Sequence, residues 1–246
     1  MSQKRLWWRW VLLIVSTLLA ASGIAGYIYL QPYEASDYAK QQLTSTASVT
    51  VADQDKWILF EPNRSTQTSI IFYPGGLVEP ESYAPFASRL AESGYRTYIV
   101  KMPLHLAVLG IDRALEIQEQ DTNETLIMGG HSLGGSMAAR YAAEQDGIDG
   151  LFLLAAYAEE GGDLSKSSMP VLSISGDKDG ILNMRNFREG KAFLPDDARY
   201  EKMQGANHAQ FGSYGPQDGD EQADIERTEQ VQRTVTLLSE WINNFR

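Results

Sequence analysis

The chain has 246 residues, of which 43% are hydrophobic and 22% are charged, a composition typical of a folded globular domain rather than a disordered chain. The absence of cysteine excludes disulfides, thiolate metal sites and a cysteine nucleophile, and three histidines are too few for a histidine-rich metal site. The net charge is −11, and past residue 30 there are 18 basic against 32 acidic residues, so we expect no nucleic-acid partner.

The first thirty residues are predicted to lie outside the fold. Residues 10–30 carry no charge, and at about 1.5 Å per residue a helix of this length spans a bilayer. Lys4, Arg5 and Arg9 precede this stretch, and aromatic residues stand at both of its ends. The pattern predicts one transmembrane helix that anchors the chain in the cell membrane through the lipid bilayer, with the remainder extracytoplasmic. The alternative is a signal peptide, cleaved to release a secreted domain.

The rest of the chain alternates between strands and helices. Residues 31–47 are polar and are predicted to form a stalk, and residues 48–60 read as an antiparallel hairpin. Apolar runs then predict strands at 69–73, 96–101, 125–128, 150–154, 171–175 and 199–203. Helices are predicted at 82–93 and 133–145, and a last helix carries an apolar stripe from Val231 to Phe245. This alternation predicts an α/β fold, with a mostly parallel sheet and helices on both faces.

The segment "MGGHSLGGSM" at residues 128–137 gathers four glycines around one serine. It lies between a predicted strand and a predicted helix, and it fits the pattern G-x-S-x-G around Ser132. In such an elbow the backbone turns so sharply that neighbouring side chains would collide, which explains the glycines. The serine hydroxyl is then exposed, and the N–H of Leu133 points to where an oxyanion would form. The alternative is a glycine-rich turn with a serine N-cap.

A serine hydroxyl becomes nucleophilic only when a base removes its proton. In chains with this elbow, the acid and then the histidine follow the serine in sequence. His208, in "MQGANHAQFG", is the histidine that satisfies this order. The acid is expected after the strand at 171–175, where "GDKDG" offers Asp177 and Asp179.

Three stretches, "GGHSLGG", "SISGDKDG" and "GANHAQFG", make residues 56–246 resemble the α/β-hydrolase superfamily, in particular its compact dienelactone-hydrolase-like and lipase-like serine hydrolases. The resemblance implies an α/β-hydrolase catalytic domain over residues 48–246 that needs no organic cofactor and no metal. We expect no large lid domain, because only 15 polar and glycine-containing residues separate Leu154 from Pro170. The resemblance also places the acid at the end of a G-x-x-D turn, which is Asp179 here. Dienelactone hydrolases proper use cysteine, so their substrate is not implied.

The same resemblance places the first oxyanion donor in "FYPGGLVEP". Pro74 stands where the family usually has a histidine, which leaves Gly76 and Leu77 as candidates, with Gly76 favoured. Together with Leu133, this residue would bind the oxyanion of an acyl substrate.

The predicted function is hydrolysis of an ester, lactone or thioester of a small to medium acyl compound by Ser132, His208 and Asp179. The alternatives are a non-catalytic binding protein with the same fold and an acyltransferase that uses the same triad. Some members of the superfamily carry the acid one strand earlier, and the residues in that position are Glu159, Glu160 and Asp163. We interpret His105 as a loop residue and the acidic segment 216–224 as solvated.

Overall fold

The structure is a computed structural model that describes residues 2–244, without the side chains of residues 2–6, 24–25 and 27–29. The chain divides into two compact units, Met1–Pro32 and Tyr33–Arg246. The eight strands described below belong to the second unit.

The first unit contains the helix α1 (Ser2–Tyr29), and the prediction of a membrane anchor in it was wrong. Of the helices in the described part of the chain, none combines the length and the apolar character needed to cross a membrane. Polar side chains interrupt the apolar run, and Ser16 and Thr17 donate hydrogen bonds back to the carbonyl of Leu13 (2.9 and 2.8 Å). Four side chains expected to flank the span lie outside the described residues: Lys4, Arg5, Tyr27 and Tyr29.

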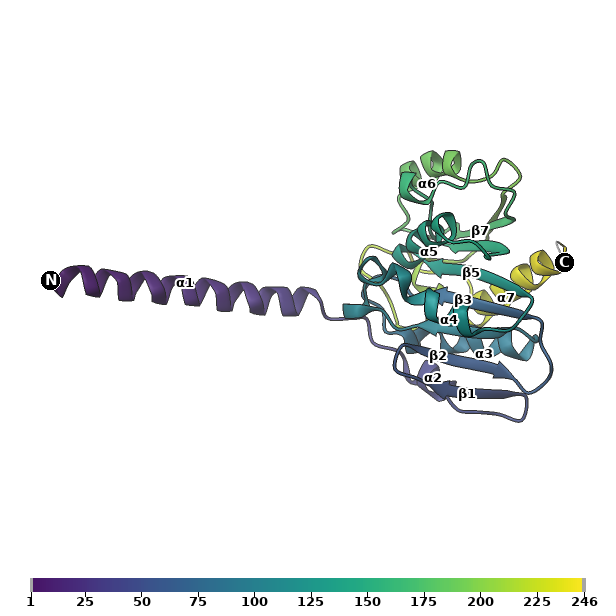
Figure 1. Ribbon diagram of the computed structural model, residues 1–246, viewed down its shortest axis with the longest axis horizontal. Coiled ribbons are helices and arrows are strands. Elements are labelled where there is room, and N and C mark those ends of the chain that lie inside the picture. The colour runs from purple at the N-terminus through teal and green to yellow at the C-terminus, as the bar shows by residue number, and fades with distance from the viewer. Residues whose placement is uncertain (1, 245–246) are drawn as a thin grey trace. The chain divides into compact units, whose positions relative to one another are not determined.

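One sheet forms the centre of the second unit, with its described strands in the order β1-β2-β4-β3-β5-β6-β7-β8 (Figure 1). The pairs β1–β2 and β2–β4 are antiparallel, and the five remaining neighbouring pairs are parallel. The mostly parallel sheet is therefore confirmed. The strands are β1 (Val49–Asp53), β2 (Trp57–Pro62), β3 (Thr68–Tyr73), β4 (Arg96–Val100), β5 (Thr125–His131), β6 (Gly150–Leu154), β7 (Val171–Gly176) and β8 (Arg199–Met203).

α-Helices lie in most connections between the parallel strands, whereas the long connection from β6 to β7 contains only a 3-10 turn. The α-helices are α2 (Asp37–Gln41), α3 (Ala84–Glu92), α4 (Ala114–Gln120), α5 (Leu133–Glu144), α6 (Met184–Gly190) and α7 (Arg227–Asn244). The 3-10 turns are η1 (Pro80–Tyr83), η2 (Pro103–His105), η3 (Ala107–Leu109), η4 (Ile111–Arg113), η5 (Glu160–Gly162), η6 (Lys191–Phe193) and η7 (Ala209–Phe211). Phe245, which ends the predicted apolar stripe of the last helix, lies outside the described residues.

The core lies in two layers, because successive side chains of a strand point to opposite faces of the sheet. Phe72 packs on one face with Leu90 of α3 and Leu238 of α7. Its neighbour Tyr73 packs on the other face with Tyr141 of α5. Every residue of β3 is buried, which explains why residues 70–73 form a continuous apolar run rather than an alternating one.

The polar segment 33–47 packs on the sheet unit, although it was predicted to be a stalk. Tyr33 donates its N–H to the carbonyl of Leu77 (2.7 Å) and accepts the N–H of Glu79 (3.1 Å). The Ser36 side chain caps the N-terminus of α2, and its hydroxyl forms a hydrogen bond with the hydroxyl of Ser213 (2.8 Å). The compact unit therefore begins at Tyr33 rather than at residue 48.

Asp121 lies at the end of the sheet opposite the carboxyl ends of the parallel strands, and its buried carboxylate bonds to residues of β3 and β4. The Asp121 side chain is only 3% exposed and accepts hydrogen bonds from Ser69 Oγ (2.6 Å) and Tyr98 Oη (2.9 Å). Arg96 Nη1 lies 3.4 Å from the same carboxylate. Burial alone would raise the pKa of Asp121, but these hydrogen bonds and the arginine charge outweigh it and lower the pKa.

Candidate active site

Ser132 forms a strained elbow between β5 and α5. Its φ of 52° and ψ of −125° are sterically unfavourable for a residue with a side chain. A Cβ at Gly130 would lie 2.6 Å from the backbone of Gly134, and a Cβ at Gly134 would lie 2.1 Å from the carbonyl oxygen of Pro74. Strand, helix and the loop after β3 are therefore in backbone contact. The glycines of the motif are required by these contacts.

Asp179 and His208 form a buried pair. Asp179 Oδ2 lies 2.9 Å from His208 Nδ1, and the two side chains are 1% and 2% exposed. Asp179 Oδ1 accepts the backbone N–H groups of Ile181 and Leu182 (2.9 and 2.8 Å), which fix the orientation of the carboxylate. Because Nδ1 donates to Asp179, Nε2 of His208 is the nitrogen that can accept a proton.

The other acidic candidates bind elsewhere. Asp177 Oδ1 accepts the backbone N–H of Gly205 (2.6 Å), and Glu159 pairs with Arg140 Nη2 (3.0 Å). Glu160 begins the turn η5, and Asp163 Oδ1 accepts the N–H of Ser165 (2.9 Å). Of the acidic residues considered from the sequence, Asp179 is the one whose carboxylate lies at hydrogen-bonding distance from His208.

Ser132 and His208 line one cavity of about 250 Å³. Its wall comes from the start of α5, the loop after β6 and the loop between β7 and α6. The remaining lining residues are Leu133, Ser136, Met137, Ala155, Ala156, Tyr157, Glu159, Ile181, Leu182 and Asn183. Residues 155–170, between β6 and β7, contain one 3-10 turn, η5, and no other helix or strand, so no lid domain is inserted there.

The loop after β3 distinguishes between the two candidate oxyanion donors. The N–H of Leu77 donates to the carbonyl of His105 (2.8 Å), so it cannot also bind a substrate oxyanion. Gly76 lies close to Leu133: a Cβ added to Gly76 would come within 3.0 Å of Leu133 Cδ2. The N–H of Leu133 belongs to the first turn of α5, where N–H groups have no partner within the helix. The geometry therefore favours Gly76 over Leu77.

A buried hydrogen-bond chain joins this loop to the elbow. Tyr83 Oη accepts the N–H of Gly75 (3.0 Å) and lies 2.8 Å from His131 Nδ1. Burial first, and the neighbouring His208 imidazole second, lower the pKa of His131 well below its ordinary value, whereas burial raises the pKa of Tyr83. The phenol therefore stays protonated and donates to the neutral imidazole. The His131 ring in turn packs 4.5 Å from the ring of His208.

Two polar residues near the pair, Asp220 and Gln230, were not identified from the sequence. The Asp220 carboxylate accepts backbone N–H groups from the loops of both Asp179 and His208, as described below. Gln230 of α7 is fully buried and bonds both backbone groups of Asn207, next to His208. The only local signal for Asp220 is the cluster of turn residues in 216–224, a segment that the sequence predicts to be solvated.

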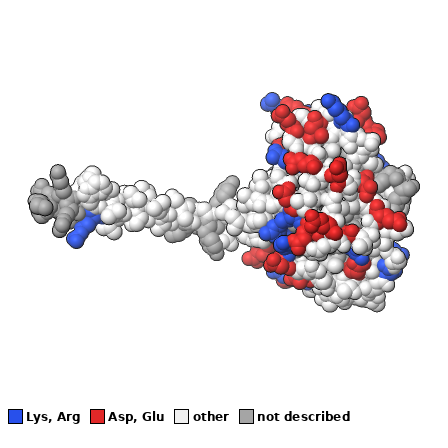
Figure 2. Space-filling view, viewed as in Figure 1, with Lys and Arg blue, Asp and Glu red and all other residues white. Residues whose placement is uncertain are grey.

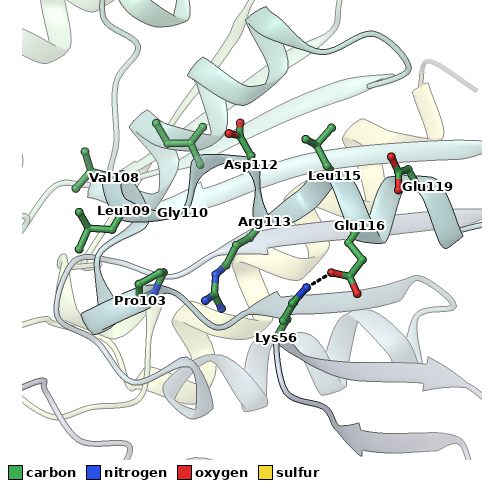
Figure 3. Close-up of a pocket in the computed structure, with 11 residues that line it drawn as sticks. Lys56, Pro103, Val108, Leu109, Gly110, Asp112, Arg113, Leu115, Glu116 and Glu119 are labelled. Atoms are coloured by element: carbon green, nitrogen blue, oxygen red, sulfur yellow. Dashed lines mark hydrogen bonds and ion pairs between the residues drawn. The ribbon is translucent and has the colours of Figure 1, made fainter.

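A larger hollow of about 840 Å³ lies beside the loop between β4 and α4 (Figure 3). Neither Ser132 nor His208 lines it, and three of its charged side chains have partners within the protein. Lys56 pairs with Glu116, and Arg113 Nη1 donates to the carbonyl of Lys101 (2.5 Å). Among the described residues, no three His, Asp or Glu side chains are grouped to hold a metal ion.

Comparison with known proteins gives a family match and solved structures of similar fold. The family described as "Alpha/beta hydrolase family" matches residues 69–232, whereas no curated protein matches the chain. A predicted CIB-like hydrolase from Thermoplasma acidophilum has a TM-score of 0.54 at 19% identity, covering 77% of this chain and 96% of that one. TT1662 from Thermus thermophilus has a TM-score of 0.58 at 14% identity, covering 78% and 98%.

A third solved structure is MGS-MChE2, an alpha/beta hydrolase enzyme from the metagenome of lagoon sediments of Mar Chica, Morocco. Its TM-score is 0.57 at 17% identity, with 79% of this chain and 98% of that chain covered. These likenesses show a shared fold, and the family match extends over most of the sheet unit. The chain belongs to the alpha/beta hydrolase family, and its fold supports a hydrolase.

Proposed function

We propose that the protein is a serine hydrolase that cleaves esters, lactones or thioesters of small acyl groups with Ser132, His208 and Asp179. The observation that carries the proposal is the buried Asp179–His208 pair beside a strained serine, with serine and histidine lining one cavity. A strained residue and a buried acid–histidine pair are costly features, and they are found together where catalysis uses them.

The chemistry begins with attack by Ser132 Oγ on the acyl carbonyl carbon, while Nε2 of His208 takes the hydroxyl proton. Asp179 keeps the other imidazole proton on Nδ1 and stabilises the imidazolium. The N–H groups of Gly76 and Leu133 bind the oxyanion. The bond to the leaving group then breaks, His208 protonates that group, and an acyl-serine remains. Water, deprotonated by His208, hydrolyses the acyl-serine, releases the carboxylic acid and restores Ser132.

The size and charge of the site favour small, uncharged substrates. A cavity of about 250 Å³ without an inserted lid cannot bury a long alkyl chain, and each buried methylene contributes about 0.8 kcal/mol. Acidic side chains are spread over the visible face of the sheet unit (Figure 2). Their field disfavours anionic substrates at low ionic strength.

A series of p-nitrophenyl esters tests the proposal. We expect kcat/KM to be highest between acetate and butyrate and to fall towards palmitate, because longer chains find no further apolar wall. Ser132→Ala should abolish the activity at every chain length. Ser136→Ala is the matched control, since Ser136 lines the same cavity but donates its hydroxyl to the carbonyl of Tyr157 (2.8 Å). A maximum at long chains would refute the small-acyl specificity, and equal activity of Ser132→Ala would refute the serine mechanism.

A further inference from the structure

Asp220 lies on the segment between η7 and α7, and its carboxylate binds two loops at once. Oδ1 accepts the N–H of Gly180 (3.0 Å), next to Asp179, and the N–H of His208 itself (3.3 Å). Oδ2 accepts the N–H of Ala209 (2.8 Å). Oδ1 also accepts the N–H of Glu221 (3.0 Å), which holds the carboxylate against its own backbone. Four N–H groups from three segments therefore converge on one side chain.

These contacts matter because Asp179 and His208 come from different loops. Asp179 follows β7, whereas His208 follows β8, and the covalent chain between them passes through α6 and β8. Hydrogen bonds from N–H groups to a carboxylate are roughly twice as strong as those to a neutral acceptor. The Asp220 carboxylate therefore restrains the relative position of the two loops, in addition to the Asp179–His208 hydrogen bond itself.

The packing around Asp220 leaves little freedom. A Cβ on Gly180 would lie 2.4 Å from the carbonyl oxygen of Gly219, so the acid loop and the segment of Asp220 are in direct backbone contact. On the other side, Asn207 Nδ2 donates to the carbonyl of Glu221 (2.8 Å). The segment that carries Asp220 therefore contacts Gly180, next to Asp179, and Asn207, next to His208.

We propose that Asp220 is a positioning residue that holds Asp179 and His208 at hydrogen-bonding distance, and that it touches neither the substrate nor the reacting atoms. The inference rests on the proposed function of the pair. Asparagine cannot replace the carboxylate, because all four partners are donors. In either orientation of the amide, its NH₂ group would face at least one backbone N–H.

The test compares Asp220→Asn with Asp218→Asn in the full chain. Asp218 is exposed on the same segment, so this control makes the same change of charge two residues away. A fluorophosphonate titrates the reactive serines, and kcat for p-nitrophenyl acetate is expressed per titrated site. We expect kcat per site to fall about 100-fold in Asp220→Asn, the cost of a displacement near 1 Å, with little change in KM. A merely structural role would instead reduce the number of titrated sites and leave kcat per site unchanged.

A second measurement does not depend on any substrate. The proton shared by His208 Nδ1 and Asp179 gives a low-field proton resonance, which we expect in the wild type and in Asp218→Asn and which Asp220→Asn should lose. The proposal is overturned if Asp220→Asn keeps this resonance, or if its kcat per site equals that of Asp218→Asn. An inactive and unlabelled wild type would refute the proposed function instead, and the resonance would still decide whether Asp220 positions the pair.

Discussion

Asp177 and Asp179 are two residues apart, yet only one of them reaches the histidine. Asp179 is bonded to His208, whereas Asp177 closes the turn before the histidine loop through the N–H of Gly205. Sequence pattern alone left both open, because each follows β7 within the same short turn. The resemblance to the G-x-x-D turn selects Asp179, and Asp179 is the residue whose carboxylate contacts His208.

We therefore predict that Asp179→Asn lowers kcat by roughly 10⁴-fold, because the amide no longer holds the imidazole in the productive tautomer. Asp177→Asn is the matched control and should cost far less, since an amide oxygen can still accept the N–H of Gly205. Steady-state kinetics on a short-chain ester measure both. If the order of the two effects were reversed, Asp179 would not be the acid.

At the scale of single elements, the features that could be predicted from sequence are those whose pattern lies within about ten consecutive residues. The elbow could be located because its G-x-S-x-G pattern lies within residues 128–137, although the atoms that a Cβ on Gly129 or Gly134 would meet belong to Phe152, Tyr73 and Pro74, outside the motif. The apolar runs located the strands for the same reason. The contacts missed from sequence join distant positions: Tyr33 to Leu77, Tyr83 to His131, and Asp220 to Gly180. No local pattern marks such pairs, and the polarity of segments 31–47 and 216–224 was interpreted as exposure.

The Asp121 cluster gives the fold a dependence on pH. Because its folded-state pKa is lowered, the carboxylate stabilises the fold above the unfolded carboxyl pKa of about 4, and this contribution is lost as pH falls through the lowered folded-state value. We predict that Asp121→Asn lowers the free energy of unfolding by about 1–3 kcal/mol at pH 7. The difference from the wild type should shrink below about pH 4. Denaturant unfolding at pH 7 and pH 3 measures it, and an equal difference at both pH values would contradict the assignment.

At the scale of the whole molecule, the site depends on a segment that precedes the sheet. Tyr33 forms a β-bridge with Val78, two residues after the proposed donor Gly76, and its backbone bonds to Leu77 and Glu79 on either side of Val78. The Tyr33 ring also packs 5.5 Å from that of Tyr214, on the chain that follows the His208 loop. The compact unit defined from Tyr33 onward therefore includes the residues that brace the oxyanion loop.

Two truncations test this boundary. A chain of residues 33–246 should keep kcat per titrated site within about twofold of the full chain, because every hydrogen bond described for the site lies within it. A chain of residues 48–246 should lose activity per site, because the two backbone hydrogen bonds of Tyr33 and those of Ser36 are removed. Equal kcat per site in the two truncated chains would show that residues 33–47 do not support the site.

The central claim is that Ser132 is a nucleophile activated by His208 and Asp179. Reaction of the folded protein with a fluorophosphonate, followed by peptide mass spectrometry, tests it most directly because the probe reports nucleophilicity without a known substrate. We predict one phosphonate per chain, attached to Ser132, with labelling lost in Ser132→Ala and unchanged in Ser136→Ala. A wild-type protein that is folded but unlabelled, or labelling that persists in Ser132→Ala, would contradict the claim.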